Sequence, residues 1–188
     1  MNPIFAAALE IQEVCESRRW RFCFIGAVAV QRWGEPRLTH DADLTLLTGF
    51  GGEEAFVDGL LGEFEGRRPD ARDFALRYRV LLLQASNGVP LDVSLGAMPF
   101  EERAVERASR FAIGETAWLL TCSAEDLIVF KAFAGRDKDW LDIEGVALRQ
   151  DRALREDLIW QELEPLLALK ESPETADRLR TLLARARG

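Results

Sequence analysis

Apolar and polar residues alternate most regularly in a short segment of the first half of the chain. In residues 41–47, Asp41, Asp43 and Thr45 fall on one side, and the intervening residues are apolar. Strict alternation over several residues is typical of a strand with one buried face. The segment is therefore predicted to be a strand that carries two carboxylates on the same face.

A β-hairpin is predicted about forty residues further along the chain. Residues 80–85 and 91–95 are rich in Val and Leu, and the connection between them contains Asn87 and Gly88. Asn-Gly between two apolar runs is the strongest short hairpin signal. In the second strand, Asp92 lies on the side opposite the apolar residues.

Helical spacing of apolar residues dominates much of the remaining chain. Helices are predicted over about 3–18, 26–33, 100–108, 124–134, 137–149, 153–169 and 174–187, with a short strand at 22–25. A helical stretch from the Gly-rich residues 49–52 to about Phe64 and a helix after Asp70 are also predicted. The fold class is therefore α+β, a mixed β-sheet with flanking helices followed by a helical C-terminal segment. We place an α/β core at residues 1–98 and the mainly helical segment at 99–188.

The composition narrows the class of protein. The chain has 188 residues, 48% of them hydrophobic and 30% charged, which is typical of an ordinary globular protein. A net charge of −8 disfavours general binding to phosphate backbones, which requires clustered Lys and Arg. The three cysteines show no paired spacing, and the longest apolar run is too short for a bilayer. We expect a cytoplasmic protein with reduced thiols and no membrane association.

The carboxylates on the predicted strands indicate a metal site. Side chains at i and i+2 of a strand share a face and lie roughly 6.5–7 Å apart along the backbone. Asp41 and Asp43 would repel one another unless a cation lay between them. Asp92 on a neighbouring strand supplies a third hard oxygen ligand of the kind that Mg²⁺ prefers. The alternative explanation of these aspartates is that they form the solvated polar face of an edge strand and bind no metal.

A strand-to-helix turn precedes the acidic strand. The apolar run ending at Ile25 enters a helix through Gly26 and Ala27. Glycine allows a phosphate to approach the backbone, and a helix N-terminus offers N–H donors and a favourable dipole. Many strand-to-helix turns contain Gly, so this turn indicates a phosphate site only in combination with the carboxylates.

Together these segments resemble a known family. The run Ile25-Gly26-Ala27, the run Arg37-Leu38-Thr39-His40-Asp41-Ala42-Asp43-Leu44 and the later Leu91-Asp92-Val93 resemble the DNA polymerase β-like nucleotidyltransferase superfamily. Within it, the chain is most similar to the AbiEii-like group of small bacterial proteins, many of them toxin components. The resemblance implies a nucleotidyltransferase-like mixed sheet that binds a nucleoside triphosphate (NTP) with Mg²⁺, or with Mn²⁺ in its place.

The resemblance also assigns roles to individual residues. It implies that Asp41, Asp43 and Asp92 are the catalytic metal ligands, with Asp92 helping to activate the acceptor hydroxyl. Gly26 and Ala27 would border the triphosphate. The family usually has Gly or Ser where this chain has Ala27, so a hydroxyl contact to phosphate is missing.

A second resembling stretch covers residues 127–143. Lys131 lies on an apolar helix face, and it is one of three lysines beside 21 arginines. A site that needs a compact charge at a phosphate favours Lys over Arg, so Lys131 is a candidate nucleotide contact. The alternative is a lysine whose stem covers the core. We expect Asp139 and Asp142 to orient basic groups or cap a helix rather than bind metal.

Three residues just before the acidic strand are weaker candidates. Arg37 and Thr39 are assigned to nucleotide binding, although a surface arginine and a residue at the start of a strand need no function. His40 is the only histidine. It is a candidate general base, but in an extended strand it would point away from the neighbouring Asp41.

These observations lead to one function and one alternative. The function is Mg²⁺-dependent transfer of a nucleoside monophosphate from NTP to an acceptor hydroxyl. The sequence leaves open whether the acceptor is a tRNA 3′ end, a protein or a small antibiotic, and whether the protein is a toxin–antitoxin component. The alternative is a catalytically weak nucleotide-binding or antitoxin-like regulatory protein of the same fold, which acts on a cognate partner protein. We expect a basic strip on the last helix to hold the acceptor or partner. The strip consists of Arg178, Arg180, Arg185 and Arg187.

Overall fold

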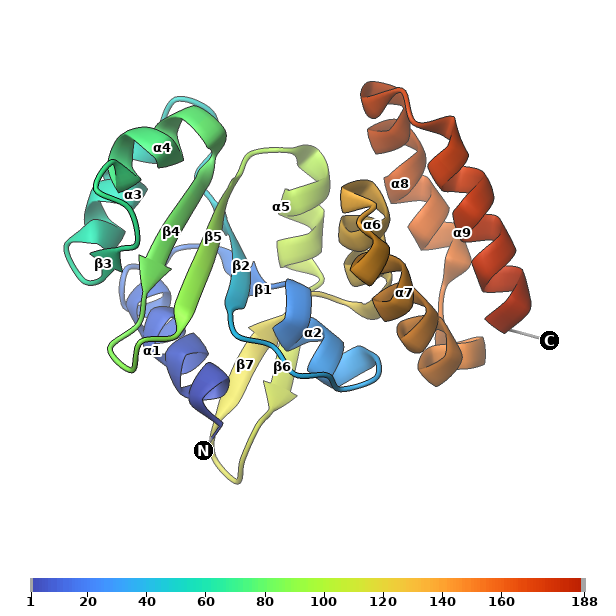
Figure 1. The fold of residues 1–188 in the computed structure, drawn as a ribbon, viewed down its shortest axis with the longest axis horizontal. Coiled ribbons are helices and arrows are strands. Elements are labelled where there is room, and N and C mark those ends of the chain that lie inside the picture. Colours follow the sequence, from blue (N-terminus) through green and yellow to red (C-terminus); the bar gives the residue numbers. More distant parts are fainter. Residues whose placement is uncertain (1, 187–188) are drawn as a thin grey trace. The chain divides into compact units, whose positions relative to one another are not determined.

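The computed structural model describes residues 2–186, which form two compact units (Figure 1). The sheet-bearing unit contains the chain up to Val28 and Leu38–Cys122. The helical unit contains Ala29–Arg37 and the chain from Ser123 onward. Each unit is described by itself below.

A mixed seven-stranded sheet is the centre of the first unit. Its strands are β1 (Phe22–Phe24), β2 (Ala42–Leu47), β3 (Glu65–Gly66), β4 (Val80–Gln84), β5 (Pro90–Gly96), β6 (Ser109–Ala112) and β7 (Trp118–Thr121). Their order in the sheet is β3-β4-β5-β2-β1-β7-β6. The pairs β2–β5 and β1–β7 are parallel, and the other pairs are antiparallel. The predicted α+β class is confirmed.

Strand β2 lies beside β5, and their pairing determines where the carboxylates meet. Asp43 is directly opposite Asp92 in the parallel register. The predicted hairpin is confirmed, because β4 and β5 are antiparallel neighbours joined by the turn that contains Gly88, with φ of 81°. Such a positive φ is easily adopted only by residues like glycine.

The helices of this unit are α1 (Pro3–Ser17), α3 (Glu53–Leu61), α4 (Ala71–Tyr78) and α5 (Pro99–Glu106). The apolar side of β2, with Leu44 and Leu46, shares a buried core with Ile11 of α1. On the other side of β2, the Thr45 hydroxyl donates to the Glu101 carboxylate of α5 at 3.3 Å. One face of β2 is thus closed by hydrocarbon, and the other carries polar groups.

Helix α2 (Gly26–Trp33) runs from the sheet-bearing unit into the helical one. The helical unit also contains α6 (Ala124–Ala134), α7 (Asp137–Gln150), a short 3-10 turn (Asp151–Ala153), α8 (Glu156–Lys170) and α9 (Pro173–Ala186). Within it, the Arg149 guanidinium donates to the carbonyl of Gly34 at 2.6 Å, which fastens the end of α2 to α7. The helices predicted for this part of the chain are confirmed to within a few residues.

The organisation differs from the sequence prediction after residue 98. The segment 99–188 was expected to be mainly helical, but β6 and β7 lie within it and extend the sheet. Because β7 pairs with β1, the sheet-bearing unit continues to Cys122 instead of ending at residue 98. Strand β3 was not predicted either, and its two residues are too few to show alternation.

Cys15, Cys23 and Cys122 are free and buried, as predicted. Burial raises the pKa of the Cys15 thiol to about 12, which keeps it protonated and unreactive at neutral pH. Among residues 2–186, none of the helices combines the length and apolar character needed to cross a membrane.

Candidate functional site

Three carboxylates converge on the polar side of β2 and β5. Asp41, Asp43 and Asp92 each offer one oxygen, and these oxygens all lie within 4.8 Å of one another. Asp43 and Asp92 are brought together by the parallel register, and Asp41 lies just before β2. The predicted convergence is therefore observed, while the role of the three residues as metal ligands stays a prediction.

Gly26 leaves room for one of these carboxylates. Its φ is 55°, and a Cβ atom at this position would lie 2.1 Å from Oδ2 of Asp43. The backbone N–H of Ile25 also donates to the Asp43 carbonyl at 2.9 Å, so the turn is fixed to β2. Any larger residue would displace the carboxylate and strain the backbone. The predicted turn and the acidic strand thus meet at Asp43, with Ala27 buried directly after Gly26.

Thr39 holds another of the carboxylates. Its hydroxyl donates to Oδ1 of Asp41 at 2.7 Å. The hydrogen bond limits rotation of the Asp41 side chain, so two of the three carboxylates are positioned by neighbours outside the strands. Thr39 was predicted to bind nucleotide, and the structure places it at the carboxylate cluster without testing that role.

Asp92 is paired with Arg67, whose Nη2 donates to Oδ1 of the carboxylate. Burial raises the pKa of Asp92 above its usual value; Arg67 opposes this shift, and the charge of Asp41 adds to it. The Asp92 carboxyl group therefore ionises at a higher pH than an exposed aspartate does.

The donor set fits a hard divalent cation. Three carboxylates supply only oxygen ligands, which suit Mg²⁺ or Mn²⁺ and not a soft metal. Asp41, Asp43 and Asp92 are partly buried, so the surrounding solvent screens their repulsion less than at an open surface. A bound divalent ion would remove this repulsion and compete with Arg67 for Asp92.

Lys131 has a different environment from these carboxylates. It is buried in the helical unit, and its ammonium donates to Asp142 at 2.6 Å and to Asp139 at 3.2 Å. A buried ammonium is tolerated only when it is paired in this way. The structure explains the position of Lys131 by ion pairing inside the unit, and its predicted nucleotide contact stays a prediction.

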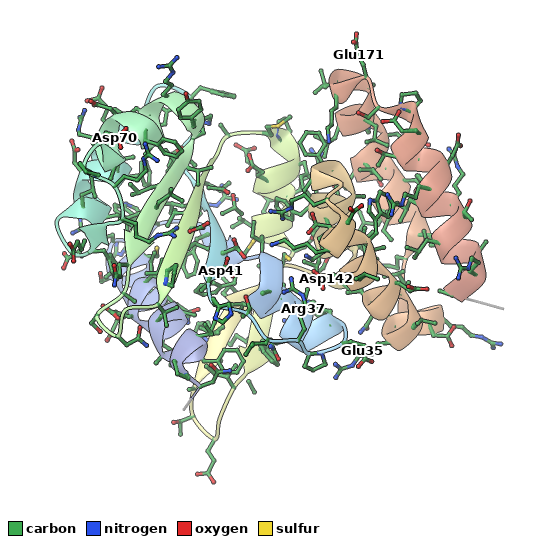
Figure 2. All side chains as sticks on the ribbon, in the orientation of Figure 1. Glu35, Arg37, Asp41, Asp70, Asp142 and Glu171 are labelled. Atoms are coloured by element: carbon green, nitrogen blue, oxygen red, sulfur yellow. The ribbon has the colours of Figure 1, made fainter. Side chains whose placement is uncertain are left out.

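Arg37 belongs to the same cluster. Its guanidinium binds both oxygens of Asp142, with Nε and Nη2 at 2.8 and 3.0 Å (Figure 2). Burial acts to raise the pKa of Asp142, but the hydrogen bonds from Arg37 and Lys131 outweigh it and hold the pKa below its usual value. The predicted phosphate contact of Arg37 is untested, and its guanidinium here holds together residues distant in sequence.

Asp139 completes the cluster at the start of α7. Its carboxylate accepts from the Arg136 backbone N–H at 3.2 Å and from Nε of Arg136 at 2.7 Å. Burial again acts to raise its pKa, and the bonds from Arg136 and Lys131 reverse this to a lowered value. The expectation that Asp139 and Asp142 orient basic groups or cap a helix is confirmed.

The arginines of the last helix lie mostly against aromatic rings. The Arg178 guanidinium is 4.4 Å from the ring centre of Trp140, and that of Arg180 is 4.9 Å from the ring centre of Trp160. Arg180 is also paired with Asp177. Arg187 lies outside the described residues, and the proposed strip stays a prediction.

Sequence reasoning did not find Arg67. It follows β3, and its backbone N–H donates to the carbonyl of Leu82, the residue of β4 that is opposite Asp92. The position of Arg67 therefore depends on a two-residue strand with no periodic signal of its own. Knowledge of β3 would have placed Arg67 beside the hairpin.

A scan of protein-family models finds none that matches, and a search of curated proteins finds no match either. The chain is similar to the solved structure of an antigenic nucleotidyltransferase-like protein from Paracoccidioides brasiliensis. That likeness has 18% identity and a TM-score of 0.49, over 95% of this chain and 93% of the other. The antibiotic-resistance factor ANT(2″)-Ia is 17% identical, with a TM-score of 0.45 over 97% and 90% of the two chains. The lincosamide antibiotic adenylyltransferase LnuA is 13% identical, with a TM-score of 0.47 over 75% and 94%.

Proposed function

We propose that the chain is a divalent-metal-dependent nucleotidyltransferase whose metal ligands are Asp41, Asp43 and Asp92. The observation that carries this proposal is the convergence of three carboxylate oxygens within 4.8 Å, from two adjacent parallel strands. The sequence resemblance to the polymerase β-like superfamily implies the same three residues.

The surroundings of the carboxylates suit a triphosphate on the side of Gly26. Because Gly26 has no side chain, the start of α2 lies directly against Asp43, and the helix N-terminus favours an anion. Ala27 contributes only its backbone there, since it has no hydroxyl. When bound, Mg²⁺ would screen the phosphate charge and lower the pKa of the acceptor hydroxyl.

The chain's own residues would perform the remaining tasks. Gly26 and Asp43 border the triphosphate, and Thr39 keeps Asp41 in position by the 2.7 Å hydrogen bond. Asp92 accepts the proton of the acceptor hydroxyl, because its carboxylate belongs to the cluster that the acceptor approaches. The hydroxyl oxygen forms a bond to the α-phosphorus, the bond to the bridging oxygen breaks, and pyrophosphate leaves.

The test is transfer of label from each α-labelled NTP, with Mg²⁺ or Mn²⁺, to cell RNA, cell protein and a small-molecule fraction. Wild-type protein should release pyrophosphate and label one class of acceptor, and Asp43→Ala should do neither. Asp73→Ala is the matched control, because Asp73 is an exposed aspartate on α4. Absence of both nucleotide binding and transfer in wild type would refute the proposal.

The second candidate is a nucleotide-binding regulatory protein with weak or no turnover. Two observations favour it: Ala27 lacks the hydroxyl that the family offers to phosphate, and Arg67 is bound to Asp92. Nucleotide binding without pyrophosphate release would select this candidate. A toxin–antitoxin role rests on the AbiEii-like resemblance alone. Slowed bacterial growth on expression, relieved by Asp43→Ala, would support it.

A further inference from the structure

A cavity opens at the end of the sheet where β2 and β5 begin. It has a volume of about 430 Å³ and lies among residues 2–4, 38–40 and 87–90, all within the sheet-bearing unit. This volume falls within the range of roughly 300–1,000 Å³ that is usual for small-molecule sites. The proposed function does not use the cavity so far.

The wall of the cavity is in direct contact with the carboxylate cluster. Thr39 lines the cavity, and its hydroxyl is 2.7 Å from Oδ1 of Asp41. His40, also in the wall, immediately precedes Asp41, and Pro90 lies two residues before Asp92. Because β2 and β5 are parallel neighbours, the segments that precede Asp41 and Asp92 lie at the same end of the two strands.

Phosphoryl transfer places a geometric requirement on the acceptor. The attacking oxygen and the departing pyrophosphate must lie roughly in line on opposite sides of the α-phosphorus. Under the proposed function the triphosphate lies at Gly26, which abuts Asp43. The cavity reaches the cluster through Thr39 and Asp41, so an acceptor bound there would approach through residues other than Gly26.

Hydrogen bonds between the walls keep the cavity formed. The Asn87 side-chain amide donates to the Pro3 carbonyl at 2.9 Å, and its oxygen accepts from the Val89 N–H at 3.1 Å. The hairpin turn and the start of α1 are thereby linked. A preformed cavity lowers the entropy lost when a ligand binds.

The lining suits an uncharged ligand. Among the described residues that form the walls there is no Lys or Arg, and Ile4, Leu38 and Val89 present hydrocarbon. A phosphate-bearing acceptor would need cationic partners there, and the neighbouring carboxylates would repel it. Asn2, His40 and Asn87 add polar side chains with nitrogen donors, and none of them carries a fixed positive charge.

We infer that this cavity is the acceptor subsite, and that it binds a small uncharged molecule bearing a hydroxyl on a largely apolar body. The inference rests on the proposed function, whose acceptor it specifies. The hydroxyl of the bound molecule attacks the α-phosphorus, pyrophosphate leaves, and the hydroxyl proton passes to Asp92. The products are a nucleoside monophosphate ester of the acceptor and pyrophosphate.

The experiment is a titration of the isotope-labelled full chain, followed by amide NMR. The probes are tyrosol, which is a neutral phenol with a hydroxyethyl arm, and para-hydroxyphenylacetate, its anionic counterpart. Tyrosol should shift the amides of Leu38, His40 and Val89, and should still do so with Mg²⁺ and a non-hydrolysable ATP analogue present. The Kd of the anion should be at least about tenfold higher than that of tyrosol.

A variant pair connects the binding to the cavity. His40→Trp should fill the space and abolish the tyrosol shifts, while the ATP analogue still shifts Gly26 and Ala27. Leu169→Trp is the matched control, because Leu169 is 73% exposed and lies in the helical unit. It should retain both responses.

The remaining outcomes separate the two proposals. No tyrosol shifts in protein that binds the ATP analogue would overturn the acceptor subsite and leave the proposed function standing. Displacement of tyrosol by the analogue would do the same, because an acceptor and a nucleotide must bind together. Shifts at these amides with the trinucleotide CCA but not with tyrosol would overturn the small-molecule assignment. No binding of the analogue would refute the proposed function, and the acceptor role with it.

Discussion

Carboxylates gather in two places in this chain, and they differ in the cations that accompany them. In the helical unit, Asp139 and Asp142 are hydrogen-bonded to Lys131, with Arg37 and Arg136 beside them. In the sheet-bearing unit, three carboxylates converge, and Asp92 is paired with Arg67. The first group is built around a buried lysine, and the second brings three carboxylate oxygens within 4.8 Å of one another.

The pKa shifts of Asp92 and Asp142, one from each group, run in opposite directions. Burial raises the pKa of Asp92. Burial acts in the same sense on Asp142, but its hydrogen bonds with Arg37 and Lys131 lower the pKa overall. Asp142 thus belongs to a group held by cations of the chain itself, whereas Asp92 belongs to the group that we propose as the metal site. This contrast separates a structural cluster from a candidate functional one.

The largest expected effect is on the cluster around Lys131. Asp142→Ala would remove one of the two carboxylates bonded to the buried ammonium of Lys131, and both hydrogen bonds that Arg37 donates to Asp142. Removing one partner of a buried ion pair costs about 3–5 kcal/mol, so the free energy of unfolding should fall by about that amount. Urea denaturation measures it, with Asp73→Ala as an exposed control that should change stability by less than about 0.5 kcal/mol. A loss below about 1 kcal/mol in Asp142→Ala would show that the cluster is not structural.

A smaller loss is expected for Lys131→Met, which keeps the aliphatic stem and removes the charge. Arg37 and Arg136 would still pair with the two carboxylates, so stability should fall by about 1–3 kcal/mol. The same variant tests the nucleotide contact predicted from the sequence. If the ammonium also holds triphosphate, NTP affinity should fall by about 1.5–3 kcal/mol as well. Unchanged affinity would assign Lys131 to the fold alone.

A still smaller effect is expected where a cation competes with metal. Arg67→Ala should strengthen Mg²⁺ binding by about two- to fivefold, because a partly exposed ion pair contributes about 0.2–1 kcal/mol. Calorimetric titration with Mg²⁺ measures the change, and Arg68→Ala, which removes a neighbouring arginine paired with Asp70, should have no effect. Weaker metal binding in Arg67→Ala would mean that the arginine supports the site.

The pH dependence should differ between the two groups. A lowered pKa in the fold means that Asp139 and Asp142 stabilise it above their unfolded-state pKa, and this stability is lost as pH falls toward the folded value. The pKa of Asp92 is raised in the fold, so protonation of Asp92 increases the free energy of unfolding. Carboxyl NMR titration should therefore show Asp92 protonating at higher pH than Asp142. The reverse order would contradict the comparison.

The features that were predictable from the sequence have local signals. Alternation in residues 41–47 and the Asn-Gly turn before Asp92 placed the carboxylates on one face of neighbouring strands, and the structure agrees. The strand-to-helix turn at Gly26 was recognised by its composition. Its close approach to Asp43 was not, because that contact depends on how two strands pair.

The features that were missed depend on contacts between distant residues. Arg37 and Asp142 are separated by 105 positions, and no local pattern connects them. Strand β6 is largely exposed and β7 has four residues, so neither shows the periodicity that a buried strand would. Their pairing with the rest of the sheet moved the unit boundary from residue 98 to Cys122.

The central claim is that Asp41, Asp43 and Asp92 bind a metal that carries NTP. Calorimetric titration of wild-type protein and Asp43→Ala with ATP, with and without Mg²⁺, tests it most directly. Wild type should bind ATP only with Mg²⁺, and Asp43→Ala should lose this binding at an unchanged melting temperature, because it removes a repelled carboxylate. Metal-independent ATP binding, or a sharp fall in the melting temperature of Asp43→Ala, would contradict the claim.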